Sequence, residues 1–205
     1  MSNKEIIEKI IKGTFNNLKE LYNKGNDELR IIFPNYTSRV KKHRISEQEL
    51  RFAFVEQLLH TPEAKTWHYS VETPTHYKYR SARNGNEPGI DGSRSGKTDL
   101  TLYDNENNPI AFFEFKAGRL SPNDDKKIFN REFKYDVIKL VSESQYYNDC
   151  LGYSLHLIEK DDDKIKNFDK YIEAVYTDYS QKLKLLSVDK PKEMVKYMPC
   201  KLNEL

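Results

Sequence analysis

The sequence predicts an α/β protein with a mixed central β-sheet flanked by helices and with a helical extension at the N-terminus. The first observation is the spacing of apolar residues, which alternates along the 205 residues between the helical and the strand period. The second is the order of the resulting segments: helix, strands, long helix, strand, helix and strand. This order is typical of a sheet whose faces are covered by helices.

The N-terminal segment predicts an amphipathic helix over residues 3–23, because its apolar residues recur at helical spacing. Gly25 and Asn26 mark its end, since both residue types favour turns. Residues 28–42 favour no single structure. The apolar positions that define the helix are Ile6, Ile7, Ile10, Ile11, Leu18, Leu21 and Tyr22.

A second helix is predicted to begin after Ser46. Ser46 and Glu49 form a Ser-x-x-Glu capping box, which is typical of a helix start. The apolar stripe of this helix follows at Leu50, Phe54 and Leu58. We therefore divide the chain into a helical extension, residues 1–44, and one compact domain, residues 45–205.

The remaining chain predicts strands around one long helix. Residues 67–80 alternate as one or two strands that Pro74 interrupts, and a loop rich in Gly and Asn follows over residues 84–96. The other expected elements are strands 98–104 and 110–117, a helix 125–147, a strand 151–158, a helix 164–179 and a strand 183–188.

The composition excludes several classes of protein. The 14 Tyr and 10 Phe supply apolar bulk that argues against global disorder, and the net charge of +2 neither requires nor excludes nucleic acid. Cys150 and Cys200 are isolated, which argues against a disulfide framework and a zinc site. No segment resembles a signal peptide or a membrane span, so we expect a cytoplasmic protein with no membrane partner.

The segment GSRSGKTD, residues 92–99, ends like a phosphate-binding P-loop but departs from that motif. A P-loop has four residues between its first Gly and its Gly-Lys pair. Here only three residues separate Gly92 from Gly96, and the position that the motif requires to be Gly is Asp91. The residues that follow alternate as a strand instead of opening a helix. The sequence therefore disfavours a nucleotide hydrolase.

The predicted hairpin brings two carboxylates together. A turn centred between Glu106 and Asn107 sets Asp99 opposite Glu114, and opposed residues have Cβ atoms about 4.5–5.5 Å apart. Lys116 lies on the same face as Glu114, because side chains alternate along a strand. Two like charges in apolar surroundings repel each other, so a shared proton, a buried Lys or a divalent cation must neutralise them.

Two carboxylates also form an oxygen site of the kind that Mg²⁺ prefers. Glu47 supplies a third acid, because helical spacing places it on or beside the apolar stripe of its helix. Glu49 and Glu56 fall on the opposite face, where we expect solvent. A Glu at a helix start also suits the helix dipole, so the role of Glu47 stays open at this point.

This pattern resembles the motif of the PD-(D/E)xK nuclease superfamily, whose fold is restriction-endonuclease-like: Asp99 comes first, and after a spacer follow Glu114, Phe115 and Lys116. The resemblance covers about residues 45–158. Thr98 stands at the place of the motif's Pro, a position that commonly varies in the family.

The resemblance implies a Mg²⁺-dependent nuclease that hydrolyses phosphodiester bonds, in particular a DNA endonuclease, with Mn²⁺ able to substitute. Asp99 and Glu114 would ligate the metal, with the carbonyl of Phe115 a further ligand. Glu47 would complete a second metal position or hold a metal-bound water. Lys116 would orient or activate the attacking water and stabilise the charge of the transition state.

Two further features are secondary candidates. Asp136 lies on the inner face of the long helix and, with Lys139 after it, resembles a D-x-x-K-L feature of some superfamily members, which implies a supporting role behind the metal ligands. A buried Asp that pairs with a core Lys or Arg is the structural alternative. On the strand 67–80, the polar side chains His68, Ser70 and Glu72 share one face, which we expect to be solvated.

Residues 76–97 interleave aromatic and basic side chains ahead of Asp99. Lys and Arg contact phosphates, and aromatic rings stack on unpaired bases, so this stretch is predicted to bind nucleic acid, with DNA favoured over RNA. The predicted contacts are Lys78, Arg80, Arg83, Arg94 and Lys97.

A catalytically weak nuclease-like module that binds nucleic acid or a partner protein is the second hypothesis for function. The N-terminal helix could dock a second copy of the chain or another protein, which keeps this hypothesis open. The complete set Glu47, Asp99, Glu114 and Lys116 favours the enzyme, because a decayed site commonly loses one of its acids or the Lys.

Overall fold

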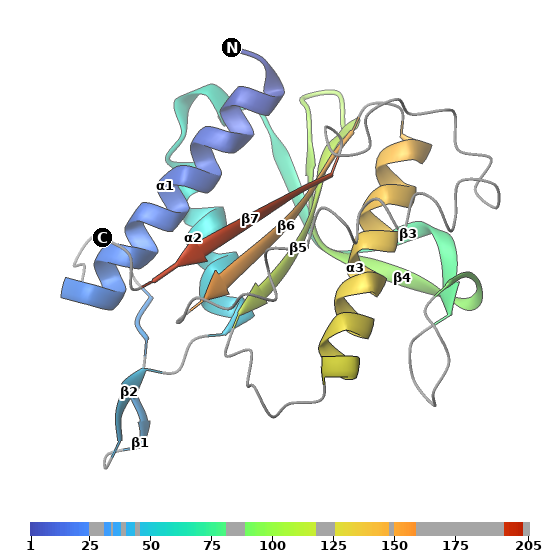
Figure 1. Ribbon diagram of the computed structural model, residues 1–205. Coiled ribbons are helices and arrows are strands. Elements are labelled where there is room, and N and C mark those ends of the chain that lie inside the picture. The colour runs from blue at the N-terminus through green and yellow to red at the C-terminus, as the bar shows by residue number, and fades with distance from the viewer. Residues whose placement is uncertain are drawn as a thin grey trace.

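The computed structural model shows an α/β protein with a five-stranded mixed sheet and, among the described residues, three α-helices (Figure 1). The described residues are 1–24, 31–33, 35–37, 40–43, 46–80, 89–117, 126–147, 150–158 and 195–202. The helices are α1 (Asn3–Lys24), α2 (Glu47–Leu59) and α3 (Lys126–Tyr146), with a 3-10 turn at Pro62–Ala64. The strands are β1 (Asn35–Thr37), β2 (Val40–His43), β3 (His68–Arg80), β4 (Gly89–Tyr103), β5 (Pro109–Ala117), β6 (Leu151–Ile158) and β7 (Val195–Lys201).

The main sheet has the strand order β3-β4-β5-β6-β7, and β1 and β2 form a separate two-stranded ribbon. The first three strands are antiparallel, whereas β5, β6 and β7 are parallel. Parallel neighbours need a long crossover between them, and α3 lies in the crossover from β5 to β6. Strand β5 is therefore the place where the antiparallel and the parallel halves of the sheet meet.

The helices cover both faces of the sheet. One apolar core lies between α1, α2 and the inward residues of β4, β5 and β6, and a second core lies between α3 and the opposite face. In β5, Phe113 and Phe115 enter the first core while Phe112 enters the second, because successive side chains point to opposite faces. Figure 1 shows α1 and α2 on one side of β5–β7 and α3 on the other.

Helix α1 belongs to the same core as the sheet. Ile7, Ile10 and Ile11 are fully buried, and burying such a side chain contributes roughly 1.5–3 kcal/mol. The helix packs against α2 and β7, and at its end Asn23 Nδ2 donates a 3.0 Å hydrogen bond to the carbonyl of Leu202. The apolar face that defined this helix in the sequence is thus used within the chain. The boundary between residues 44 and 45 lies outside the described residues.

Most predicted elements are confirmed within a few residues: the helices over 3–23 and 125–147, the helix start after Ser46, and the strands over 67–80, 110–117 and 151–158. The strand predicted over 98–104 is the end of the longer strand β4. Strand β7 was not predicted from the sequence. The predicted helix 164–179 and strand 183–188 lie outside the described residues.

The predicted loop over residues 84–96 is wrong from Gly89 onward, because this stretch is the first half of β4. Glycine permits an unusually close approach to β3: a Cβ on Gly92 would lie 1.8 Å from the carbonyl group of Tyr79. The segment GSRSGKTD is therefore a strand, which agrees with the exclusion of a P-loop. Residues 84–88 are outside the described part of the chain.

None of the described helices combines the length and the apolar character that a membrane-spanning helix needs.

Candidate active site

The candidate site lies where β4 and β5 separate. The two strands pair from Leu102 to Leu100 in the register predicted from the turn, and Leu100 opposite Phe113 is the last pair. The predicted direct pairing of Asp99 with Glu114, one position further, is therefore not part of the ladder. Beyond this point β4 continues with β3 as its partner, and β5 continues beside β6. The backbone N–H of Phe115, freed by this separation, donates a 2.7 Å hydrogen bond to Asp99 Oδ2.

Glu114 points from β5 towards α3 and is buried, with 1% of its side chain exposed. Its neighbours Phe113 and Phe115 point to the other face, as strand alternation requires. Lys139 on α3 lies 2.6 Å from Glu114 Oε1. The buried carboxylate therefore has a direct positive partner from the helix that packs on it.

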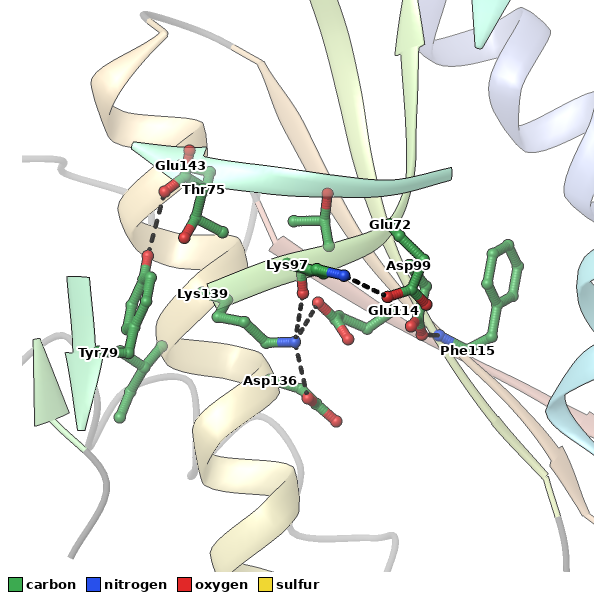
Figure 2. A network of polar contacts seen from close by, with 12 residues as sticks. Glu72, Thr75, Tyr79, Lys97, Asp99, Glu114, Phe115, Asp136, Lys139 and Glu143 are labelled. Carbon is green, nitrogen blue, oxygen red and sulfur yellow. Dashed lines mark hydrogen bonds and ion pairs between the residues drawn. The ribbon is translucent and has the colours of Figure 1, made fainter. Parts of the chain in front are cut away.

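The ammonium group of Lys139 is surrounded by oxygen atoms from three elements. Besides Glu114 on β5, it contacts Asp136 Oδ1 on α3 at 3.2 Å and the carbonyl oxygen of Lys97 on β4 at 3.0 Å. Figure 2 shows Lys139 extending from α3 to these oxygen atoms. The contact with the carbonyl of Lys97 is a hydrogen bond, and the contacts with the two carboxylates are ion pairs.

Lys116 lies further along β5, nearer to solvent. Its ammonium group is 3.0 Å from Asp136 Oδ2 and 3.7 Å from Glu47 Oε1 at the start of α2. Asp136 thus bridges the two lysines, one with each carboxylate oxygen. Lys116 and Glu47 are part-exposed, whereas Asp136 and Lys139 are buried, so the group has an open side and a closed side.

Arg51 was missed by the sequence reasoning. It lies one helical turn after Glu47 on α2, and its guanidinium group is 3.3 Å from Asp99 Oδ1 and 3.6 Å from Glu72 Oε1. The spacing of four residues from Glu47 was the available signal, because residues four apart share a helix face. Arg51 is buried and supplies the counter-charge of Asp99.

Glu72 is not simply part of a solvated strand face, as the sequence suggested. Its carboxylate, although half-exposed, pairs with Arg51 and lies 3.5 Å from the ammonium group of Lys97. Its backbone has a φ of 52°, which is uncommon for a residue with a side chain. Such conformations collect near functional sites. Glu72 therefore adds an acid at the edge of the site.

One expectation for α2 is wrong. Glu49, which was expected to face solvent, is buried, and its carboxylate contacts the hydroxyl group of Ser46. The contact joins the two side chains of the predicted capping box, and it turns Glu49 back onto the helix start. Glu47 is the more exposed of the two acids and reaches Lys116.

Burial and charge shift the pKa values in different directions. Burial raises the pKa of Glu114 well above its ordinary value, against the opposing effect of Lys139. Burial opposes the charged forms of Lys139 and Lys116 too, but the surrounding carboxylates outweigh it and raise both pKa values. For Asp136, the two lysines outweigh burial and lower the pKa. Both lysines are therefore held in their charged form, whereas burial favours the protonated form of Glu114.

The arrangement answers the electrostatic question that the sequence raised. Asp99 and Glu114 are neutralised by Arg51 and Lys139, so a cation is not required to balance their charges. Lys116, which the sequence placed on the same strand face as Glu114, contacts Asp136 and Glu47 instead.

The donor set nevertheless fits a hard divalent ion. Asp99 and Glu114 offer carboxylate oxygens with further lone pairs, and Mg²⁺ is commonly held by one or two carboxylates together with several waters. In the described part of the chain, no three His, Cys, Asp or Glu side chains come close enough together to hold a metal. An ion held by Asp99 and Glu114 would therefore have two carboxylate ligands and would need water for the rest of its coordination.

The basic residues predicted to bind nucleic acid lie on the β3–β4 ribbon. Lys78 and Arg80 are on β3, and Arg94 and Lys97 are on β4; all four are exposed. Register places Lys78 opposite Ser95 and next to Arg94. Arg83 lies outside the described residues. The ribbon thus carries positive charge from the edge of the sheet to the point where Asp99 begins the site.

Glu143 on α3 fixes this ribbon to the helix. Its carboxylate accepts hydrogen bonds from the backbone N–H groups of His76 and Tyr77, at 3.0 and 3.4 Å, and from Tyr79 Oη at 3.1 Å. The register of β3 and β4 shifts between Pro74 and Lys78, so these N–H groups belong to an irregular stretch of strand. Figure 2 shows the bond between Tyr79 and Glu143. Sequence reasoning had not singled out Glu143.

Comparisons of the chain with protein-family models, with curated proteins and with solved structures find no match.

Proposed function

We propose that the protein is a Mg²⁺-dependent nuclease that hydrolyses phosphodiester bonds, acting as an endonuclease on DNA in preference to RNA. One observation carries the proposal: Asp99 and Glu114 stand on adjacent strands directly after the last pair of β4 and β5, and the N–H group of Phe115, the residue after Glu114, donates to Asp99. Lys116 follows two residues after Glu114 on β5. The order of helices and strands around this point supports a restriction-endonuclease-like core.

The acids supply the metal-binding part of the proposed site. Asp99 and Glu114 would hold the ion, with the carbonyl of Phe115 as a further ligand and Glu47 placed to hold a water on the open side. A bound Mg²⁺ polarises the phosphate and lowers the pKa of a bound water. Mn²⁺, which accepts the same oxygen ligands, is expected to replace Mg²⁺.

The basic residues supply the substrate-binding part. The raised pKa of Lys116, which Asp136 and Glu47 maintain against the opposing effect of burial, keeps its ammonium group charged. A charged Lys116 stabilises negative charge that develops on the phosphate, which is the role that its geometry supports over that of a general base. The exposed side chains Lys78, Arg80 and Arg94 would follow the nucleic-acid backbone into the site.

A second candidate is a module that binds nucleic acid, or a partner protein, without cleaving nucleic acid. The observation that favours it is the pairing of Glu114 with Lys139 and of Asp99 with Arg51, because these ion pairs complete the centre without a metal. The two candidates share the basic ribbon and differ in whether the acids bind a divalent ion.

The deciding experiment is a cleavage assay with supercoiled plasmid, linear duplex and single-stranded DNA, and with RNA, in Mg²⁺, in Mn²⁺ and in EDTA. The wild type is compared with Lys116→Gln and with Lys12→Ala, which changes an exposed lysine on α1. We expect cleavage in either metal, none in EDTA, loss in Lys116→Gln and no change in Lys12→Ala.

Nicking of closed circular plasmid would identify an endonuclease, since such a substrate has no ends. Binding of DNA by the wild type and by Lys116→Gln alike, with no cleavage in either metal, would reject the enzyme in favour of the binding module.

A further inference from the structure

Lys139 occupies a position that would suit a small cation. Its ammonium nitrogen lies 2.6 Å from Glu114, 3.0 Å from the carbonyl oxygen of Lys97 and 3.2 Å from Asp136. Two carboxylates and one backbone carbonyl are the kind of oxygen ligands that Mg²⁺ and Mn²⁺ accept. Only 6% of the Lys139 side chain is exposed, so the ammonium group is enclosed with these oxygens.

The position is built from three separate elements. Glu114 comes from β5, the carbonyl of Lys97 from β4, and Asp136 and Lys139 from α3. The ring of Tyr135 closes one side, with its centroid 5.1 Å from the ammonium nitrogen. Moving Lys139 away would leave oxygen atoms from both strands and the helix without their shared donor.

The charges of the site limit how many ions it can accept. Counted as ionised, the site has five negative charges and four positive ones: the acids are Glu47, Glu72, Asp99, Glu114 and Asp136, and the bases are Arg51, Lys97, Lys116 and Lys139. The sum of −1 becomes +1 with one divalent ion and +3 with two. Repulsion inside a partly buried site rises steeply with such an excess, because its effective dielectric constant is well below that of water.

We propose that Lys139 permanently takes the place of one cation, so that the centre binds a single divalent ion beside Asp99 and Glu114. The inference rests on the proposed function, since it assigns the metal stoichiometry of the same site. Lys139 then has two effects: it holds β4, β5 and α3 together in the absence of metal, and it excludes a second ion.

The test is a count of bound Mn²⁺ on the full-length chain after treatment with a chelator. Free Mn²⁺ is followed by electron paramagnetic resonance, and binding heat is measured by calorimetry. We expect one Mn²⁺ per wild-type chain, one per chain in the control Lys12→Ala, and none in Glu114→Gln. Lys139→Ala, which removes the ammonium group and leaves space among its oxygens, should bind two.

Lys139→Met separates charge from space, because it keeps most of the side-chain volume. It should still bind one ion, about tenfold or more tightly than the wild type, because a positive charge beside Glu114 has been lost. This variant and the wild-type count decide the question if Lys139→Ala does not fold, which circular dichroism shows.

Two ions on the wild type, or none, would overturn the inference, as would a folded Lys139→Ala that binds one ion with wild-type affinity. A single ion that persists in Glu114→Gln would also overturn it, since the ion would then be elsewhere. DNA cleavage measured on the same samples tests the proposed function separately. One bound ion without cleavage would support the inference and reject the nuclease. Cleavage by a protein that binds two ions would support the nuclease and reject the inference.

Discussion

The ammonium group of Lys116 on β5 lies 3.0 Å from Asp136 Oδ2 on α3, so an acid from a helix that packs on the sheet holds the lysine of the candidate motif. Burial opposes the charge of Lys116, but Asp136 and the other nearby carboxylates outweigh it and raise the lysine's pKa. A lysine in this setting remains an ammonium ion at neutral pH. It can donate hydrogen bonds and offset negative charge, and it cannot accept a proton from water.

The first prediction distinguishes these roles by exchanging Lys116. Lys116→Arg keeps the positive charge and should retain cleavage within about tenfold of the wild type, whereas Lys116→Gln should lose roughly 10²–10³-fold, the usual cost of removing a donor that stabilises a transition state. Initial rates of plasmid nicking in Mg²⁺ measure both. Equal and complete loss in the two variants, with folding intact, would instead indicate that a neutral lysine acts as a base.

The second prediction concerns the pair of Arg51 and Asp99. Arg51→Met leaves Asp99 without its counter-charge and should lower the free energy of unfolding by about 1–2 kcal/mol, a value reduced from that of fully buried pairs because Asp99 keeps some contact with solvent. Urea unfolding measures the loss, with Lys12→Met as the matched control.

A double-mutant cycle gives the sharper test of this pair. Asp99→Asn should destabilise the protein less in the Arg51→Met background than in the wild type, because the partner is already absent. Strictly additive effects would show that the 3.3 Å contact contributes nothing to stability.

The parts of the site that the sequence predicted are those that local geometry determines. The turn between β4 and β5 fixes the register of the hairpin, and strand alternation then places Glu114 and Lys116 on one face. The alternative that a buried Asp136 pairs with a core Lys is confirmed, but the partners of Glu114 and Asp99 were beyond this reasoning. Lys139 is 25 residues from Glu114, and its pairing depends on how α3 crosses the sheet. Arg51 likewise reaches Asp99 only through the packing of α2 on the sheet.

The errors in the fold have similar causes. The first half of β4 is rich in Gly and Ser, which favour loops locally, yet Gly92 is what permits the backbone of β4 to approach Tyr79. Strand β7 contains Pro199 and shows little alternation of buried and exposed residues, so its sequence does not predict a strand. It is a strand because it pairs with β6. Tertiary contacts decide both cases.

The third prediction concerns the basic ribbon. Lys78→Ala and Arg94→Ala should each weaken DNA binding and reduce the salt dependence of the affinity by about one released counter-ion, because exposed cations there would contact phosphate. Lys97→Ala should have the smaller effect, since Lys97 already pairs with Glu72. Fluorescence anisotropy over a series of salt concentrations measures both quantities. Salt slopes that match those of Lys12→Ala would place the DNA elsewhere on the protein.

The fourth prediction concerns the pH dependence of stability at Glu143. Burial raises the pKa of this carboxyl above its ordinary value of 4.5, although the N–H groups of His76 and Tyr77 and the hydroxyl of Tyr79 favour its ionised form. Between the unfolded and the raised folded pKa, the folded protein binds more protons than the unfolded chain. The contribution of Glu143 to stability is therefore fully present at the acid end of this window and declines as the pH rises through it.

Glu143→Gln removes this titration while keeping an acceptor for the N–H groups of β3, and His76 and Tyr79 are retained. The free energy of unfolding of the wild type minus that of Glu143→Gln should therefore fall as the pH rises from about 4.5, and then become constant above the folded pKa. Urea unfolding at a series of pH values gives this difference, with Glu20→Gln, an exposed position on α1, as the control. A difference that rises with pH would mean that the hydrogen bonds to Glu143 outweigh its burial, so that the folded protein favours the carboxylate.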